Sequence, residues 1–307
     1  MILCCGEALI DMLPRQTTTA EPAFAPYPGG AVFTTARALG RLGADAGFLC
    51  GLSSDLFGAQ LRAALHDSRV ATDLCPIVDR PTTLAFVSLQ DGQARYVFYD
   101  ENTALRALTQ AELPVIPARV STLFFGGISL VGEPCGSTFE ALCAGAGDRV
   151  VMLDPNIRPG FLRDVPAYRA RLARMMARAD IVKLSDEDLR WVAPDRTEAE
   201  AVAALLDGGP VLVLITKGAG GATAWTVRGA RHMPARAVAV VDTVGAGDTF
   251  NAGILAALGT AGMLDRAALR GLGAQTIDAA LALATRAAAV TASRAGANPP
   301  WPHDLRD

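Results

Sequence analysis

The stretch that decides the fold reads VAVVDTVGAGDTFNAGILAAL and covers residues 238–258. An apolar run leads into the turn Gly245-Ala246-Gly247, and the pattern after it predicts a helix over residues 248–258. Backbone N–H groups at the start of a helix lack partners and carry partial positive charge, so this turn can hold an anion. Asp248 stands beside it, where a carboxylate can accept a proton from a hydroxyl group. On these residues alone, a helix cap preceded by an ordinary turn is the simpler interpretation.

Outward from this stretch, short apolar runs alternate with longer helical patterns. We predict buried strands at residues 2–5, 46–50, 122–125, 150–153, 181–183 and 211–216. We predict helices at residues 32–41, 56–67, 137–144, 168–178, 198–206, 248–258 and 277–293. This alternation is typical of right-handed βαβ units in a mostly parallel sheet. Ligands of such sheets bind beyond the carboxyl ends of the strands, so motifs that follow a strand are the best functional candidates.

Two regions break the alternation. Residues 13–27 are polar, contain prolines and show no helical period. Residues 84–89 and 94–99 alternate apolar and polar side chains around Gln-Asp-Gly-Gln, which predicts a β-hairpin with Asp91-Gly92 in its turn. A sheet covered by helices has no place for this hairpin. We therefore expect one α/β domain over residues 1–307, with a small β lid inserted at about 13–27 and 84–100.

Composition excludes several classes of function. Lys and Arg number 28 against 31 Asp and Glu, a net charge of −3 without the basic surface typical of nucleic-acid-binding proteins. The six cysteines form no Cys-x-x-Cys pair, which favours free thiols in a reducing cytoplasm. The chain begins MILCC, without a basic leader, and the alanine-rich stretch 277–292 is interrupted by Asp278 and Arg286. We therefore expect neither nucleic acid nor a membrane as a partner.

Two motifs resemble those of one enzyme family. The string DTVGAGDTFNAG, residues 242–253, is similar to the C-terminal signature of the ribokinase-like (PfkB) sugar kinases almost residue for residue. Residues 29–43, GGAVFTTARALGRLG, resemble the N-terminal signature, with Thr34 where the family usually has Asn. Similarity extends from Gly6 to Ala297. The resemblance implies a three-layer α/β/α fold with a mostly parallel sheet and a β lid. It also implies transfer of the γ-phosphoryl group of ATP, with Mg²⁺, to a primary hydroxyl of a small sugar.

The resemblance also implies roles for individual residues. Asp248 would be the catalytic base, and Gly245, Ala246 and Gly247 would form the anion hole. The implied sugar-binding residues are Asp11, Gly29, Gly30, Thr34, Phe98, Asn156 and Arg158. The implied ATP-binding residues are Lys183, Ser185, Thr216, Gly218 and Gly221. Asp188 would order Mg²⁺ through water, with Ser185 and Asp188 replacing the Asn and Glu of the family's Asn-x-x-Glu motif. Positions where many members bind K⁺ are Asp242, Thr243, Ser293 and Gly296.

Structural alternatives exist for these assignments. Asp11 can be an ordinary loop residue, and Gly29 and Gly30 can simply form a turn. Arg158 can lie in a surface loop, paired with Asp154 or Asp164. Ser185 can cap a helix whose first turn carries acidic side chains, an interpretation compatible with the functional one.

The string FFGGISLV, residues 124–131, and DPNIRP, residues 154–159, resemble bacterial fructokinases, so fructose is the expected substrate. Asp100 stands where fructokinases often carry Arg. Negative charge from Asp11 and Asp100 would disfavour the acidic substrate 2-keto-3-deoxygluconate, which is the alternative within the family.

Two alternatives belong to other functional classes. A non-catalytic sugar- or nucleotide-binding protein of the same fold is the second alternative, although the intact Asp248 argues against it. A Rossmann dehydrogenase is excluded because no Gly-x-Gly-x-x-Gly follows the first strand.

We also expect a homodimer in which two lids pair through an exposed apolar face that includes some of Phe86, Val97 and Tyr99.

Overall fold

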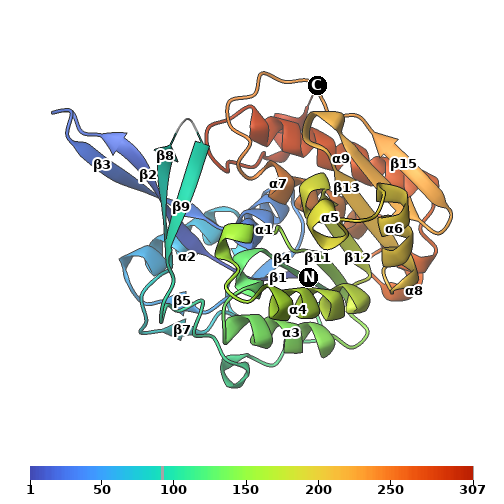
Figure 1. Ribbon diagram of the computed structural model, residues 1–307, viewed down its shortest axis with the longest axis horizontal. Helices are drawn as coiled ribbons and strands as arrows, with labels where there is room; N and C mark the ends of the chain where they lie inside the picture. The colour runs from blue at the N-terminus through green and yellow to red at the C-terminus, as the bar shows by residue number, and fades with distance from the viewer. Residues whose placement is uncertain (91–92, 307) are drawn as a thin grey trace.

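The computed structural model describes residues 1–90 and 93–306, and within them the main sheet has nine strands (Figure 1). The strand order is β15-β14-β13-β12-β11-β10-β1-β4-β6. In chain order the strands are β1 (Ile2–Cys5), β4 (Ala46–Leu49), β6 (Val70–Ala71), β10 (Thr122–Gly126), β11 (Val150–Asp154), β12 (Ile181–Ser185), β13 (Leu212–Thr216), β14 (Ala222–Thr226) and β15 (Gly229–Met233). Neighbours from β6 to β13 pair in parallel, which confirms the predicted sheet. The antiparallel edge strands β14 and β15 were not predicted.

Helices pack on both faces of this sheet (Figure 1). They are α1 (Ala31–Arg41), α2 (Leu56–Asp67), α3 (Cys135–Ala144), α4 (Val165–Arg178), α5 (Asp186–Val192), α6 (Glu198–Asp207), α7 (Ala246–Thr260), α8 (Arg266–Arg270) and α9 (Ala274–Ala292). Short 3₁₀ turns are η1 (Gln110–Glu112), η2 (Gly127–Leu130), η3 (Pro159–Phe161), η4 (Gly218–Gly220) and η5 (Pro302–Leu305). Helix α7 contacts both α1 and α9, whereas α3 packs against α4. The predicted helices are all present, α5 is the helix that Ser185 was expected to cap, and α8 is additional.

Strands β1, β4, β10 and β11 are buried along their whole length. Continuous apolar strands of this kind belong in a sheet covered on both faces, and this explains why they read as unbroken apolar runs rather than alternating ones. All six cysteines are buried and unpaired, and they pack as small apolar residues. No helix in the described part of the chain combines the length and the apolar character that crossing a membrane requires.

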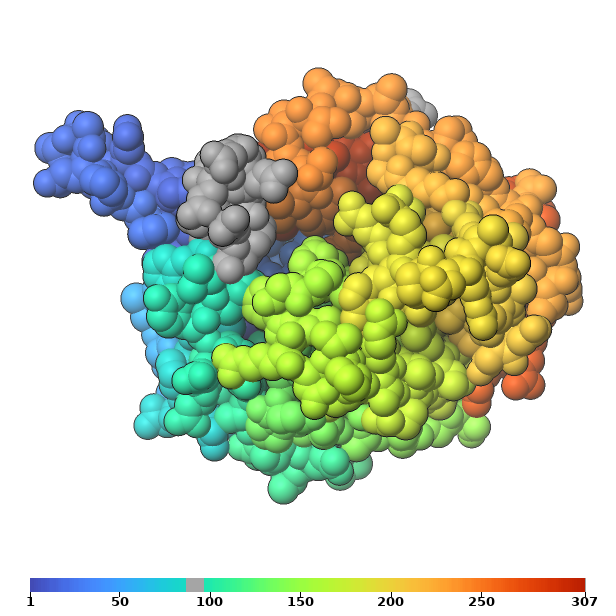
Figure 2. Space-filling view, in the orientation of Figure 1, coloured from blue at the N-terminus to red at the C-terminus, as the bar shows by residue number. Residues whose placement is uncertain are grey.

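A second, smaller sheet has the strand order β3-β2-β8-β9. Its strands are β2 (Leu9–Gln16), β3 (Pro22–Gly29), β8 (Leu84–Gln90) and β9 (Gln93–Tyr99). The hairpin of β2 and β3 stands clear of the main body (Figure 2). Strand β2 pairs antiparallel with β3 and parallel with β8, so the two predicted inserts do meet in one sheet. The predicted Asp91-Gly92 turn lies outside the described residues. A separate pair joins β5 (Leu52–Ser53) to β7 (Ile77–Val78).

The stretch at residues 238–258 differs from its prediction in where its helix begins. The apolar run at residues 238–241 forms no strand, and the side chains of Val240 and Val241 are 64% and 63% exposed. Backbone hydrogen bonds from Val241 and Asp242 to the Ala292 carbonyl hold this segment against the end of α9. Helix α7 begins at Ala246, two residues earlier than predicted, with Gly245 as its N-cap. Asp248 therefore lies in the first turn, and the interpretation of Asp248 as a helix cap is wrong.

Candidate active site

A cavity of about 630 Å³ follows the carboxyl edge of the main sheet, where β1, β10, β11, β12 and β13 end. Most of the predicted site residues line it: Asp11, Gly29, Gly30, Thr34, Phe98, Asn156, Arg158, Lys183, Ser185, Asp188, Thr216, Gly218, Thr243, Gly245, Gly247 and Asp248. Ala246, Gly221, Asp242, Ser293 and Gly296 do not. Further residues that line it were given no role from the sequence, among them Glu7, Ile128, Phe161 and Lys217.

The start of α7 forms one wall of this cavity. Gly245 has a φ of 78°, and a Cβ atom placed there would lie 2.8 Å from the Ala297 Cβ, so both the backbone and the space require glycine. In the described part of the chain, the N–H groups of Gly247 and Asp248 have no acceptor. The N–H of Ala246 donates to the Thr243 carbonyl at 3.3 Å. Free N–H groups at the start of a fifteen-residue helix are the elements of an anion-binding site.

The Asp248 carboxyl group lies in an environment that favours its neutral form. Burial raises its pKa well above the ordinary value, and the negative charges of Asp154 and Glu7 raise it further. Lys183 and Arg158 act in the opposite direction. The backbone carbonyl of Asp248 accepts a hydrogen bond from the Thr35 hydroxyl at 3.2 Å, which ties α7 to α1. A carboxylate with a raised pKa is suited to accept a proton near neutral pH.

A buried ion pair lies beneath this wall. The Lys183 ammonium group donates to Asp154 Oδ2 at 2.9 Å, and Asn251 Nδ2 donates to the same oxygen at 2.7 Å. Burial alone would lower the pKa of Lys183, but Asp154 raises it, so the ammonium group stays charged. A Cβ placed on Gly247 would lie 3.4 Å from Lys183 Nζ, so this cation adjoins the free N–H groups of α7.

Arg158 follows β11 and is exposed along the cavity. Its guanidinium group donates to the carbonyl of Ile157 at 3.1 Å and, among the residues that the structure describes, has no carboxylate partner. Asp154 is bound to Lys183, and Asp164 instead caps α4 by accepting from the Ala167 N–H. The alternative in which Arg158 pairs with either of these acids is therefore wrong, and the guanidinium group remains available to an anion.

Asp11 and Gly29 lie side by side where β2 pairs with β3. A Cβ atom on Gly29 would lie 2.0 Å from Asp11 Oδ2, so only glycine allows this approach. Burial raises the pKa of Asp11 to about 6. Nearby, Thr34 is buried in the first turn of α1, and its N–H donates to the Gly30 carbonyl.

Phe98, from the small sheet, packs edge-to-face on Phe161 with ring centroids 3.9 Å apart. This contact joins the small sheet to the main body at the cavity. The DPNIRP string predicted polar groups in this loop, but no pattern in the sequence indicated the role of Phe161.

Ser185 and Asp188 form a reciprocal cap at the start of α5. Ser185 Oγ accepts from the Asp188 N–H at 3.0 Å, and Asp188 Oδ2 accepts from both the N–H and the hydroxyl of Ser185. Asp188 Oδ1 accepts from the Ile157 N–H at 2.9 Å, which leaves this oxygen one lone pair. The predicted helix cap is thus confirmed, and it also holds the loop that bears Arg158. Within residues 1–90 and 93–306, no group of three or more His, Cys, Asp or Glu side chains could hold a metal ion.

Gly221 and Asp242, which do not line the cavity, lie in two different loops. Gly221 has a φ of 85°, and its Cβ would lie 2.2 Å from the Met233 carbonyl oxygen, so this glycine shapes the turn after β13 and does not reach the cavity. Asp242 accepts from the N–H groups of Val244 and Gly296, both at 3.0 Å. The two predicted halves of the K⁺ site therefore do lie together.

A second cavity of about 460 Å³ adjoins the first and shares Phe98, Ile128 and Phe161 with it. Asp100 faces this second cavity and pairs with Arg106 at 2.7 Å. The expectation that Asp100 brings negative charge to the sugar side is therefore wrong, because Asp100 faces the adjoining cavity and its charge is paired with that of Arg106.

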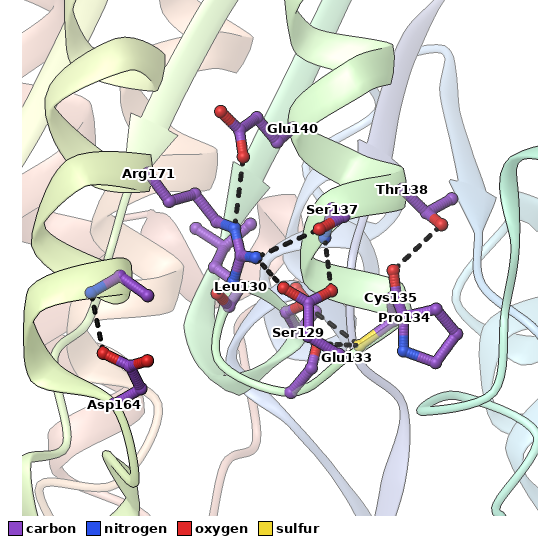
Figure 3. A network of polar contacts seen from close by, with 12 residues as sticks. Ser129, Leu130, Glu133, Pro134, Cys135, Ser137, Thr138, Glu140, Asp164 and Arg171 are labelled. Atoms are coloured by element: carbon purple, nitrogen blue, oxygen red, sulfur yellow. Dashed lines mark hydrogen bonds and ion pairs between the residues drawn. The ribbon is translucent and has the colours of Figure 1, made fainter.

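Figure 3 shows the network on the side of η2 near this second cavity. Arg171 donates to the Leu130 carbonyl at 2.7 Å and also contacts Glu133, Ser137 and Glu140. These contacts satisfy the buried guanidinium group of Arg171, and they anchor the end of η2.

A nine-stranded, mostly parallel sheet, free N–H groups at the start of α7, an adjacent carboxylate and a small β-sheet beside the cavity are together typical of sugar kinases. The chain belongs to the pfkB family of carbohydrate kinases, whose profile matches residues 1–304. It is therefore an ATP-dependent sugar kinase.

Several relatives within this family are fructokinases. The chain is 51% identical over 278 residues to a fructokinase of Rhizobium leguminosarum bv. trifolii, covering 90% of this chain and 85% of that protein. It is 35% identical over 264 residues to a fructokinase of Salmonella typhimurium, covering 84% of each. The structure of a Xylella fastidiosa fructokinase with bound ATP matches with a TM-score of 0.88 and 31% identity, over 96% of this chain and 93% of that one. A Vibrio cholerae fructokinase double mutant with fructose, ADP and potassium ion matches with a TM-score of 0.84 and 26% identity, with the same coverage.

Proposed function

We propose that this kinase phosphorylates fructose at a primary hydroxyl group. One observation supports this most directly: the free N–H groups of α7 and the Asp248 carboxyl open into the same cavity as Asp11 and Gly29. A phosphoryl donor on one side and a sugar on the other would thus meet at Asp248. The 51% identity to a fructokinase favours fructose among the small sugars.

The reaction follows from this arrangement. Asp248 takes the proton of the sugar hydroxyl while that oxygen bonds to the γ-phosphorus, and the bond from this phosphorus to the β–γ bridging oxygen breaks, releasing ADP. The N–H groups of Gly247 and Asp248 and the Lys183 ammonium group hold the non-bridging oxygens as negative charge moves onto them. Asp11 accepts hydrogen bonds from sugar hydroxyls and so fixes which hydroxyl faces Asp248.

We propose that two cations act in or beside the cavity. Asp188 Oδ1 can accept from one water, which suits Mg²⁺ because this ion keeps several waters and takes few protein ligands. When bound, Mg²⁺ spreads the charge of the ATP phosphates. Asp242 and Gly296 join the two segments where we propose K⁺, supported by the relative from Vibrio cholerae whose structure holds potassium ion.

The small sheet is proposed to act as a lid over the sugar and to pair with a second copy. In a strand, successive side chains face opposite sides, so Val97 and Tyr99 face away from the cavity that Phe98 lines. Phe24, Phe86 and Tyr99 make successive edge-to-face contacts, and Phe24, Val97 and Tyr99 are exposed. An exposed aromatic surface of this kind favours a C₂ dimer. The six free thiols favour a reducing compartment, which we propose to be the cytoplasm.

The test is ADP release from ATP with a panel of sugars. We expect the highest kcat/KM for fructose and a lower value for 2-keto-3-deoxygluconate. One observation favours the acidic sugar: among the described residues the Arg158 guanidinium group has no carboxylate partner, so it could pair with the carboxylate of the substrate. A higher kcat/KM for the acidic sugar would overturn the proposal and assign Arg158 to the substrate carboxylate.

A further inference from the structure

The geometry points to Glu7 as a positioning residue. It lies beneath the sugar side of the cavity and holds together the two segments that form this side, the start of α1 and η2. This inference rests on the proposed function, because it concerns how the same cavity holds its sugar. Glu7 lies just after β1 and its side chain is only 1% exposed, so it offers almost no surface to a ligand. It acts through the backbone of the two segments that it joins.

The Glu7 carboxylate accepts three backbone hydrogen bonds from distant parts of the chain. Oε1 accepts from the N–H groups of Ala31 at 2.8 Å and Val32 at 3.3 Å, the first residues of α1. Oε2 accepts from the Ser129 N–H of η2 at 3.3 Å. The N-cap of α1, Gly30, has no side chain to offer, so Glu7 takes over the capping role from another segment.

Two glycines make room for Glu7: Gly127 for its carboxylate and Gly30 for its backbone carbonyl. Gly127 has a φ of 66°, and a Cβ atom there would lie 2.0 Å from Glu7 Oε1. Gly30 has a φ of 111°, and its Cβ would lie 2.9 Å from the Glu7 carbonyl oxygen. Both glycines line the cavity. The two segments that form this side of the cavity thus close around one buried carboxylate.

Each of the two segments that Glu7 joins also carries a residue that lines the cavity, and α1 contacts Asp248 as well. Helix α1 carries Thr34 in the cavity, and its Thr35 hydroxyl donates to the Asp248 carbonyl. Turn η2 carries Ile128 in the cavity and is anchored at its far end by Arg171 (Figure 3). Glu7 is therefore the inner support of η2, and it couples η2 to α1.

Glu7→Gln tests the assignment with almost no change in shape. An amide has one acceptor oxygen, so if this oxygen faces α1, the new NH₂ group faces the Ser129 N–H and the two donors repel. We expect KM for fructose to rise about tenfold, because charge-assisted hydrogen bonds to η2 or α1 are lost. KM for ATP should stay within about twofold, and kcat should fall less than KM for fructose rises.

Two controls separate positioning from general loss of stability. Asp180 is also a buried carboxylate and accepts from the Val151 N–H at 2.9 Å, but it lies at the opposite edge of the sheet. Asp180→Asn should lower Tm and leave both KM values unchanged. Gly127→Ala displaces the Glu7 carboxylate, whereas Gly147→Ala imposes similar strain at a φ of 60° with nothing within 4 Å. We expect only Gly127→Ala to raise KM for fructose.

The order of the experiments keeps a failure of the proposed function apart from a failure of the Glu7 assignment. The wild-type protein is assayed first, so a different preferred sugar corrects the proposed function, and the same comparison is then made with that sugar. Equal KM values for the preferred sugar in folded Glu7→Gln and wild-type protein would overturn the assignment, as would an equal rise for Asp180→Asn. If Glu7→Gln does not fold, the alanine pair decides. If Gly127→Ala also fails to fold while both controls fold, Glu7 is a folding residue and the assignment is wrong.

Discussion

The start of α7 and the small β-sheet face the same cavity, but they are built in opposite ways. The proposed anion site at α7 comes from one continuous stretch, in which a turn that requires glycine at Gly245 leaves the backbone N–H groups of Gly247 and Asp248 free. The small sheet needs β2 and β3 to meet β8 and β9, which lie more than fifty residues further along the chain. A site made from local backbone geometry tolerates little change in its motif. A site made from long-range pairing can change its side chains while keeping its shape.

The largest expected effect comes from Asp248→Asn, which breaks the chemistry at α7 and keeps its shape. Loss of a general base typically lowers kcat by about 10²–10⁴-fold, with KM for ATP little changed. Single-turnover kinetics with the preferred sugar measure this directly. Asp278→Asn, the same change at an exposed ion pair with Arg231, should leave kcat unchanged. Near wild-type turnover of Asp248→Asn would remove Asp248 from its role as the base.

A smaller loss is expected from Arg158→Ala, in the loop opposite α7. If this guanidinium group holds the moving phosphoryl group, kcat for fructose falls roughly 10–100-fold and KM changes less, because the interaction strengthens as charge moves. Arg163→Ala is the matched control, since Arg163 is exposed in the same loop and lies 3.8 Å from Glu101. A rise in KM with kcat unchanged would instead place Arg158 in sugar binding.

The contrast between the two regions also explains what the sequence could predict. Gly245 and Asp248 were predictable because their motif is contiguous and its physics is local. The buried runs of β1 and β11 predicted the parallel sheet in the same way. The aromatic contact of Phe98 with Phe161 depends on how two distant segments meet, and no local pattern encodes that. Asp100 and Arg106 pair within one loop, six residues apart, and this irregular loop has no period from which the pair could be predicted. Glu7 could have been found from its position, because it is an acidic residue soon after the buried strand at residues 2–5.

A pH effect of about tenfold is expected at Asp11, where the small sheet meets α1. Burial raises the pKa of Asp11 to about 6, so its carboxylate is lost as pH falls through 6. The kcat/KM for fructose should then fall about tenfold per pH unit below that point. The raised pKa values of Asp248 and Glu7 act in the same direction, so the comparison needs Asp11→Asn, which removes only the Asp11 contribution to this acid limb.

Stability should respond to Asp11 in the opposite sense. A carboxyl whose pKa is higher in the folded state binds protons more tightly there, so its contribution favours folding below pH 3.8 and is lost as pH rises to about 6. Asp11→Asn should therefore raise Tm at pH 7 and leave it unchanged near pH 3, while it lowers kcat/KM at neutral pH. An unchanged Tm at pH 7 would show that Asp11 is not desolvated.

The smallest effect on catalysis is expected at the far face of the small sheet. Tyr99 is 62% exposed there and packs on Phe86, so Tyr99→Asp would place a charge in the proposed dimer interface. A desolvated unpaired charge costs several kcal/mol, enough to convert the dimer to monomer in light scattering. We expect kcat to change by less than about threefold, because Phe98 and the α7 site face the other way.

Val115→Asp, at an exposed valine outside both sheets, should leave the dimer intact. A monomeric wild-type protein would rule out the dimer, and the small sheet would then serve only as a lid over the cavity. A dimer that persists in Tyr99→Asp would move the interface to another surface.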